Sequence, residues 1–159
     1  MLRKQLIQPI DKQVSRGEIS IPDTATVLVT SERLDHPIDY ICDGQRGPGS
    51  TRWIAERPGD QTVVLAFDTA QDIQVVSLEI EEKEVSRTQE LTLSTSRDGG
   101  QTYREVLRQE FNFSPPDTTF EHEEWRLAAK GITHVRVWIR PDKGGRPCYA
   151  SMTTLALQG

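Results

Sequence analysis

Apolar and polar residues alternate along the segment 72–83 with a period of two. Val76, Leu78 and Ile80 are apolar, whereas the residues that follow each of them are serine or glutamate. Successive side chains of a β-strand point to opposite faces, so this alternation predicts a strand with one buried face and one face in water. Such strands are typical of antiparallel sheets, because parallel sheets are usually covered on both faces.

The rest of the chain carries similar strand signals. Runs rich in β-branched and aromatic residues, bounded by Pro, Gly or Asp, span residues 25–30, 61–67, 72–83, 91–96, 102–111, 122–127, 132–140 and 148–158. Long amphipathic helical patterns are absent from the sequence, and only a short stretch around 127–130 would tolerate a helix. The sequence therefore predicts an all-β fold, an antiparallel β-sandwich of the jelly-roll type with about eight strands.

Length and composition fit one domain. The 159 residues are 35% hydrophobic, which is enough for one sizeable core. Pro9, Gly17 and Pro22 interrupt any regular element near the N-terminus. We therefore predict an N-terminal strap or tail over residues 1–24 and a single sandwich domain over residues 25–159.

The charge balance and the N-terminus restrict the expected partners. With 24 acidic and 19 basic residues the formal net charge is −5, so no nucleic-acid partner is expected. No segment has the length and apolarity of a membrane span, and the N-terminus lacks the apolar run of a signal peptide. This predicts a cytoplasmic location, or an extracellular one if a signal segment was removed. Cys42 and Cys148 show neither zinc-site spacing nor a dense disulfide framework.

The stretch 96–103 contains a turn with a recognisable pattern. Its sequence, SRDGGQTY, fits S-x-D-x-G-x-T-aromatic and resembles the Asp-box hairpin of sialidase propellers. A propeller needs several copies over repeated blades, and this chain has one. We therefore predict a simple hairpin, in which Asp98 bonds its own turn backbone and Gly99 and Gly100 supply the positive φ angles.

Several segments together resemble discoidin domains, also called coagulation-factor type C domains. The similar segments are HPIDYICDGQRGPGSTRW (36–53), TVVLAFDTAQDIQVVSLEI (62–80), LTLSTSRDGGQTYREV (91–106), ITHVRVWIRP (132–141) and SMTTLALQG (151–159). They occur in the family's order over roughly residues 25–159. The resemblance implies a galactose-binding-like jelly roll, a class of mostly non-catalytic modules that bind sugars, phospholipid head groups or proteins through loops at one end.

A sugar site needs an exposed aromatic face together with planar polar groups that bond hydroxyls. The family's sugar sites use a loop histidine, an arginine and an aromatic residue. The residues of this chain that we expect to bind a ligand are His36, Arg57, Arg87, Arg146 and Tyr149. Two other interpretations stay open. Charged loops can serve solvation alone, and the same fold can be an intracellular protein-interaction or structural domain without a sugar ligand.

The resemblance also implies a possible structural calcium ion, although no cofactor is required. Asp43 matches the family's ligand-bearing aspartate, and Ser50 and Thr51 lie where a hydroxyl or carbonyl ligand would be expected. Calcium prefers about six to eight oxygen ligands, including more than one carboxylate. Gln45 and Thr154 replace acidic residues of the family pattern, so Asp43 could instead only cap its own turn.

The remaining expectations concern the places of two tryptophans and whether the chain is an enzyme. We expect Trp53 to be a core residue. Trp138 should share an outward face with Arg136 and Arg140, covered by the strap or by a neighbouring strand. The cysteines and histidines form no recognised catalytic motif, and the acidic runs alternate as solvated strand faces would. We therefore predict a binding module rather than an enzyme, with a saccharide or a protein as its partner.

Overall fold

The computed structural model describes residues 3 and 17–159 of the chain. Nine strands and two short helices form within this range. The strands are β1 (Glu18–Ile19), β2 (Ala25–Val29), β3 (Trp53–Ile54), β4 (Gln61–Glu81), β5 (Arg87–Ser96), β6 (Arg104–Phe113), β7 (Phe120–Arg140), β8 (Ser151–Met152) and β9 (Thr154–Gln158). The helices are α1 (Ile21–Thr24) and the 3₁₀ helix η2 (Ile38–Cys42). The prediction of an all-β antiparallel fold is confirmed.

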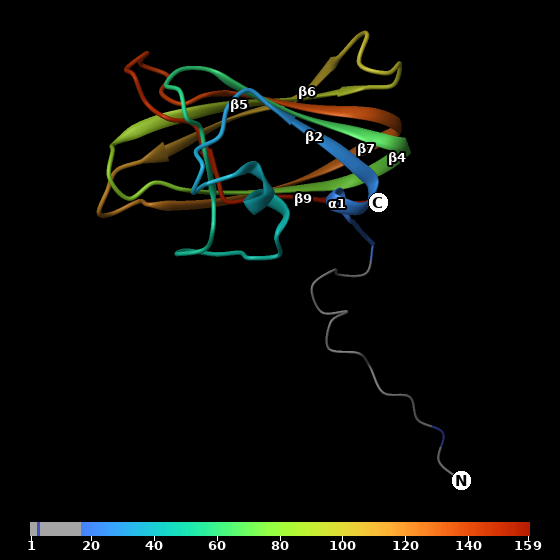
Figure 1. The fold of residues 1–159 in the computed structure, drawn as a ribbon, viewed down its shortest axis with the longest axis horizontal. Coiled ribbons are helices and arrows are strands. Elements are labelled where there is room, and N and C mark those ends of the chain that lie inside the picture. The colour runs from blue at the N-terminus through green and yellow to red at the C-terminus, as the bar shows by residue number, and fades with distance from the viewer. Residues whose placement is uncertain (1–2, 4–16) are drawn as a thin grey trace.

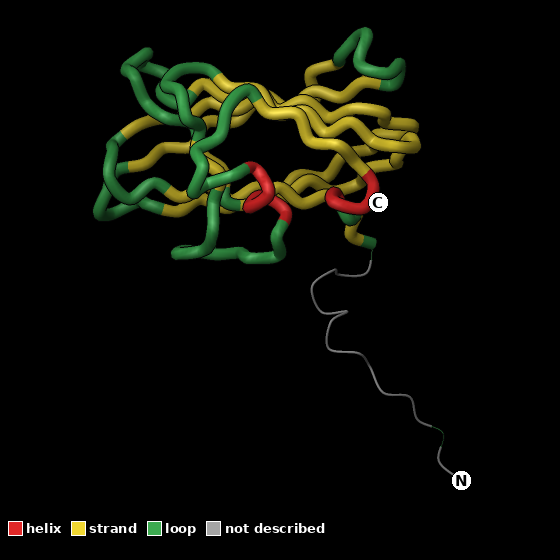
Figure 2. The backbone as a smooth tube through the Cα atoms, in the orientation of Figure 1, coloured by secondary structure: helices red, strands yellow, loops and turns green. Residues whose placement is uncertain are grey.

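The long strands β4 and β7 pair with each other and pass through both layers of the sandwich. The first half of β4 also pairs with β2, and the second half of β7 also pairs with β5, which in turn pairs with β6. The second half of β4 pairs instead with β9, next to β1. These partners define two layers that enclose the core (Figure 1). Strands dominate both of them, and the helices lie at their margins (Figure 2).

Both long strands differ from the sequence-based expectation. Each was predicted as two strands with a break, but the ladder between them continues, with register shifts between Ala66 and Val75 that let the strands bend. The stretch around 127–130 is strand rather than helix, because Ala129 pairs with Ile73 and packs against the core. The helices α1 and η2 are four and five residues long, too short to give a helical periodicity in the sequence.

The core lies between the layers, as the alternation predicted. Val76, Leu78 and Ile80 are fully buried. Trp53 is also fully buried, and its indole N–H donates to the carbonyl oxygen of Ser31 at 3.0 Å, so it is the core residue that we expected. Trp138 is half-buried on the outward face. The Cζ atom of Arg140 lies 5.2 Å from the centre of its ring.

The polar face of the second half of β4 is not in water, which corrects the prediction of a wet face. Glu79 and Glu81 are buried, because the loop after η2 lies over them. The backbone N–H of Gly47 donates to Oε1 of Glu79 at 2.7 Å, and that of Gly49 donates to Oε2 of Glu81 at 2.8 Å. Two carboxylates therefore hold this loop on the sheet, a contact that strand periodicity could not reveal.

The predicted strap over residues 1–24 lies only partly within the described residues. Its described part adds the short strand β1, which pairs with β9 at the sheet edge. Ile21 of α1 is buried against the core. This segment therefore packs against the sandwich, beside the C-terminus (Figure 1). No helix among the residues that the structure describes is long and apolar enough to cross a membrane.

The turn between β5 and β6 has the hydrogen bonds that its sequence predicted. Oδ1 of Asp98 accepts the backbone N–H of Thr102 at 2.9 Å, and Oδ2 accepts its hydroxyl at 2.5 Å. Ser96 donates a third bond at 2.7 Å. These bonds, led by that of the Thr102 hydroxyl, lower the pKa of Asp98 to about 2. Gly99 and Gly100 have φ angles of 77° and 86°, which favour glycine.

We expect the substitution Asp98→Ala to lower the melting temperature at pH 7 by a few degrees, because the turn loses its acceptor. The native pKa is about 2 and the ordinary value is 3.8, so the charged form stabilises the fold above about pH 4. That stabilisation is lost as the pH falls towards 2. Melting curves from pH 7 to pH 2 should therefore show the two proteins converging below about pH 4.

Asp68→Ala is the control, because the exposed Asp68 side chain makes no hydrogen bond to a described residue. This substitution should leave the pH dependence unchanged. A constant difference between Asp98→Ala and the native chain from pH 7 to pH 2 would contradict the assignment.

Candidate functional site

Four connecting segments meet at one end of the sandwich, which we call the loop end (left in Figure 1). They are residues 30–37, 55–60, 82–86 and 141–150. Backbone hydrogen bonds join two of them, since the N–H of Ala55 donates to the carbonyl oxygen of Ala150 at 2.9 Å and that of Gly59 donates to the carbonyl oxygen of Cys148 at 3.1 Å. The opposite end, the hairpin end, carries the turn 97–103 and the C-terminus. Residues from distant parts of the sequence therefore meet at the loop end.

Tyr149 provides an aromatic surface at the loop end. Its side chain is 41% exposed, and the Cζ atom of Arg33 lies 4.5 Å from the centre of its ring. His36 belongs to the same turn as Arg33, and its Nδ1 lies 3.0 Å from the carbonyl oxygen of Arg52. An aromatic ring, a guanidinium group and a half-buried imidazole therefore lie on adjoining segments.

Arg57 and Arg146 are both exposed, and hydrogen bonds hold the guanidinium group of each one in place. Arg57 donates from Nη2 to the carbonyl oxygen of Thr30 at 2.8 Å. Arg146 donates from Nε to Oδ2 of Asp142 at 2.9 Å and from Nη2 to the carbonyl oxygen of Ser86. The bond from Arg146 is the main cause that lowers the pKa of Asp142. Both arginines thus have a set orientation and exposed surface for a ligand.

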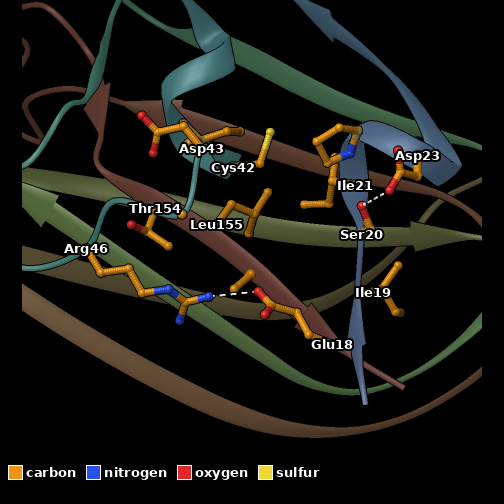
Figure 3. A pocket seen from close by; sticks show the side chains of 14 residues that line it. Glu18, Ile19, Ser20, Ile21, Asp23, Cys42, Asp43, Arg46, Thr154 and Leu155 are labelled. Atoms are coloured by element: carbon orange, nitrogen blue, oxygen red, sulfur yellow. Dashed lines mark hydrogen bonds and ion pairs between the residues drawn. The ribbon is translucent and has the colours of Figure 1, made fainter. Parts of the chain in front are cut away.

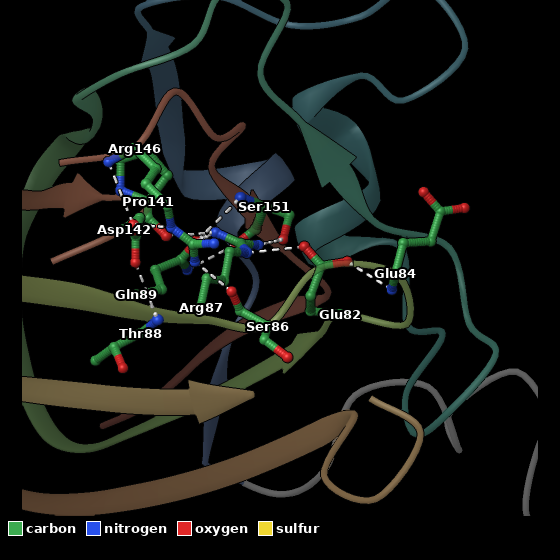
Figure 4. Close-up of polar contacts among 10 residues, drawn as sticks. All are labelled: Glu82, Glu84, Ser86, Arg87, Thr88, Gln89, Pro141, Asp142, Arg146 and Ser151. Atoms are coloured by element: carbon green, nitrogen blue, oxygen red, sulfur yellow. Dashed lines mark hydrogen bonds and ion pairs between the residues drawn. The ribbon is translucent and has the colours of Figure 1, made fainter. Parts of the chain in front are cut away.

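Arg87 lies elsewhere than the sequence suggested. We expected it on an exposed loop, but it is the first residue of β5 and its side chain is 1% exposed. Its guanidinium donates to Glu82 and Gln89 at 2.8 Å each, as well as to the carbonyl oxygen of Pro141 and the hydroxyl of Ser151 (Figure 4). Arg87 therefore links the segments around the loop end and leaves no open face for a sugar.

The loop end contains further residues that the sequence did not single out. No sequence pattern indicated that Arg33 belongs to the site, because its partner Tyr149 is far away in the sequence. Leu34 is fully exposed and Val85 is 40% exposed, both on loops of this end. Single exposed apolar side chains are normal on protein surfaces, so these two do not by themselves mark a binding surface.

Neither of the two described cavities is lined by the five predicted ligand-binding residues. One cavity, of about 220 Å³, lies between α1, η2 and β9 (Figure 3). An ion pair between Arg46 and Glu18 at 2.8 Å crosses its edge. Burial, followed by the charges of Asp39 and Asp43, raises the pKa of the Cys42 thiol, which makes it a weak nucleophile. Cys42 and Cys148 are both free.

The residues predicted to bind calcium are held by contacts within their own loop. Asp43 accepts the backbone N–H of Gln45 at 2.9 Å and the hydroxyl of Thr51 at 2.5 Å. Ser50 donates its hydroxyl to the carbonyl oxygen of Arg46. Thr154, in the place of an acidic residue, donates to the carbonyl oxygen of Gln45 at 3.3 Å. Hydrogen bonds thus engage both oxygens of the single carboxylate in this set.

The surroundings of this loop do not fit a calcium ion. Oε1 of Glu81 is buried and accepts no hydrogen bond from a described residue. However, Nζ of Lys83 lies 3.4 Å from it and Nη1 of Arg52 lies 3.8 Å from it, so cations already surround this oxygen. Within the described part of the chain, no group of three or more His, Cys, Asp or Glu side chains is placed to hold a metal. Calcium needs more carboxylate oxygens than this loop supplies.

Similarity to known proteins is found at the level of structure. No protein-family model matches the chain, and no curated protein matches it. The CBM32-3 module of a family 31 glycoside hydrolase from Clostridium perfringens has a TM-score of 0.65 at 15% sequence identity, over 91% of this chain and 96% of that module.

Similar solved structures that contain sugars include two from Clostridium perfringens. The CBM32-5 module of CpGH89 from Clostridium perfringens, in complex with GalNAc-β-1,3-galactose, has a TM-score of 0.62 at 18% identity, over 89% of this chain and 99% of that one. The family 32 carbohydrate-binding module of Clostridium perfringens NanJ, in complex with galactose, has a TM-score of 0.58 at 14% identity, over 90% of this chain and 98% of that one. The chain therefore has the jelly-roll β-sandwich fold of these modules.

We expect Arg87→Met to destabilise the protein by about 2–4 kcal/mol, because it removes one partner of a largely buried ion pair and leaves Gln89 and Pro141 without their donor. Urea unfolding measures this difference. The control is Arg108→Met, since Arg108 pairs with Glu105 at the surface, where solvent screens the ion pair, and should contribute far less to stability. Equal losses in the two variants would contradict the structural role of Arg87.

Calcium should not stabilise the protein. We expect the melting temperature to be the same in millimolar calcium and in excess chelator, because a ligand that does not bind the native state does not shift unfolding. Asp43→Ala should lower the melting temperature equally in both conditions. A shift of several degrees on adding calcium, lost in Asp43→Ala, would instead establish a calcium site.

Proposed function

We propose that this protein is a non-catalytic carbohydrate-binding module that binds a saccharide at the loop end. The proposal depends on one observation, the partly exposed ring of Tyr149, over one face of which the guanidinium of Arg33 lies. A pyranose ring has an apolar face that packs on an aromatic ring, and its hydroxyls need donors and acceptors at the rim. The arrangement around Tyr149 offers both.

The neighbouring polar groups would bond the sugar hydroxyls. His36 and Arg57 lie on segments joined to that of Tyr149, and Arg146 lies on the same long connection as Tyr149. In this proposal Arg87 is a positioning residue, because it binds Pro141 and Ser151 on either side of the segment that carries Arg146 and Tyr149.

The solved structures support a sugar ligand and the fold class to which we assign the chain. Modules of similar structure are in complex with galactose or GalNAc-β-1,3-galactose. Within this class, the order of the segments between residues 25 and 159 supports a discoidin-type domain.

Two carboxylates of the loop end are bound to arginines, which supports binding rather than catalysis. Glu82 accepts a hydrogen bond from Arg87 at 2.8 Å, and Asp142 accepts one from Arg146 at 2.9 Å. The lowered pKa of Asp142 keeps it ionised, so it cannot act as a general acid at neutral pH. Glycoside hydrolysis requires one carboxyl group that donates a proton and a second one that acts as a base or nucleophile.

A second function, the binding of a protein partner at the same end, would use the fully exposed Leu34 as an apolar contact. An isolated apolar side chain at a loop tip contributes little to hydroxyl recognition, but it fits an apolar depression on another protein. If Leu34→Asp abolishes binding of an identified protein while Tyr149→Ala leaves it intact, this second function applies.

Tyr149→Ala should weaken saccharide binding about three- to tenfold, since a ring contact of this kind contributes about 0.5–1.5 kcal/mol. A glycan array should identify the ligand, with galactose and GalNAc-β-1,3-galactose as the first probes. Calorimetric titration of the native and variant chains then measures the change in affinity.

Tyr103→Ala is the matched control, because Tyr103 lies at the hairpin end and is also in contact with an arginine, Arg136. It should bind the loop-end saccharide like the native chain. The absence of any array signal at high protein concentration, or equal affinity of Tyr149→Ala and the native chain, would refute the sugar site.

A further inference from the structure

A second cavity, of about 580 Å³, lies at the hairpin end, away from the loop end. The turn 97–103 and the start of β6 form one wall, and residues 126–129 of β7 form the other. Ligand sites commonly measure roughly 300–1,000 Å³. This groove therefore has the volume of a ligand site, although it contains none of the residues that we assign to the loop end.

Three arginines without acidic partners line this groove. Arg97, Arg104 and Arg126 form no ion pair and no side-chain hydrogen bond with any residue in the described ranges. The groove contains one acidic residue, Glu105, whose carboxylate accepts a hydrogen bond from Arg108 at 2.9 Å. The groove is therefore locally positive on a chain with a formal net charge of −5.

This unpaired charge differs from that at the loop end. There Arg57 and Arg146 each donate to oxygens of the protein, and Arg87 donates to four partners. Arg33 forms no side-chain hydrogen bond or ion pair with a described residue, but its guanidinium lies over the ring of Tyr149. A guanidinium group presents a planar set of donors that matches a carboxylate. The groove arginines keep all of these donors available, so an anionic ligand would not have to displace a protein partner.

The floor and the walls of the groove suit a ring-shaped ligand. Leu127 and Ala129 pack against the core and form an apolar floor with the buried Ile132. Tyr103 lines the same groove, and the Cζ atom of Arg136 lies 4.0 Å from the centre of its ring. An aromatic ring and apolar floor beside three guanidinium groups favour a ligand with both apolar ring faces and negative charge.

The strand edges add backbone groups that can bind hydroxyls. Among the described strands, β6 pairs only with β5, and residues 120–129 of β7 pair only with β4. Each wall therefore has one strand edge outside the ladders, with N–H and C=O groups that face away from the sheet. Such groups would bond the hydroxyls of a sugar chain.

From these contacts we infer that the groove is a second binding site, which takes a carboxylated oligosaccharide, a short chain of uronic acid residues. The guanidinium groups of Arg104 and Arg126, on opposite walls, bind its carboxylates. Tyr103 and the apolar floor contact its rings. This site does not depend on the saccharide site proposed at the loop end.

The test is calorimetric titration of the full chain with tetragalacturonic acid and with its methyl ester, which has the same sugar skeleton without the charge. We expect the acid to bind at least tenfold more tightly than the ester. Arg104→Gln and Arg126→Gln should each weaken binding of the acid about tenfold, and the double variant should abolish it. Melting curves of all variants check that they remain folded.

Lys143→Gln is the control, because it removes one positive charge at a residue that already pairs with Glu110 of β6 and lies outside the groove. It should bind the acid within about twofold of the native chain. Tyr149→Ala should also bind the acid normally, so a failure here is separate from a failure at the loop end.

Three results would overturn the inference. The ester could bind as tightly as the acid, or Lys143→Gln could lose as much affinity as Arg104→Gln, which would indicate general attraction of anions. Alternatively, a sulfated oligosaccharide of equal charge could bind as tightly through the same arginines, which would refute carboxylate recognition.

Discussion

The pairing of β4 with β7 is the interaction on which the rest of the structure depends. Its ladder runs from Gln61 and Ile139 at one end to Glu81 and Phe120 at the other. Because the two halves of each strand have different further partners, this one ladder connects both layers of the sandwich. It thereby directs the connecting segments to the two ends where we place the binding sites (Figure 1).

Buried polar groups then hold the loops against this frame. Glu79 and Glu81 accept backbone N–H groups from the loop after η2, and Arg87 binds both sides of the connection between β7 and β8. A buried charge without partners is costly, so each of these side chains favours one arrangement of its loop. Arg87 thus orders the loop end while its own side chain remains out of reach of a ligand.

The sequence indicated some of the candidate site residues and not others. His36, Arg57 and Tyr149 were expected at one end because the resemblance indicated the kinds of residue required. Arg87 was placed wrongly among the exposed loops, because its position in the sequence next to a charged loop does not reveal the partners that bury it. The groove around Arg104 had no sequence signal, since its walls come from separate strands.

The sequence by itself determined the strands and the main turn. The alternation of residues 76–81 specified which side chains share a face, and Asp98 with Gly100 specified the hairpin, because both depend on neighbours along the chain. Only the tertiary structure decided what covers each face. Glu79 looks solvated in the sequence but is buried, and Arg33 meets Tyr149 across a long separation. These contacts depend on how distant segments pack, and a local pattern does not encode that packing.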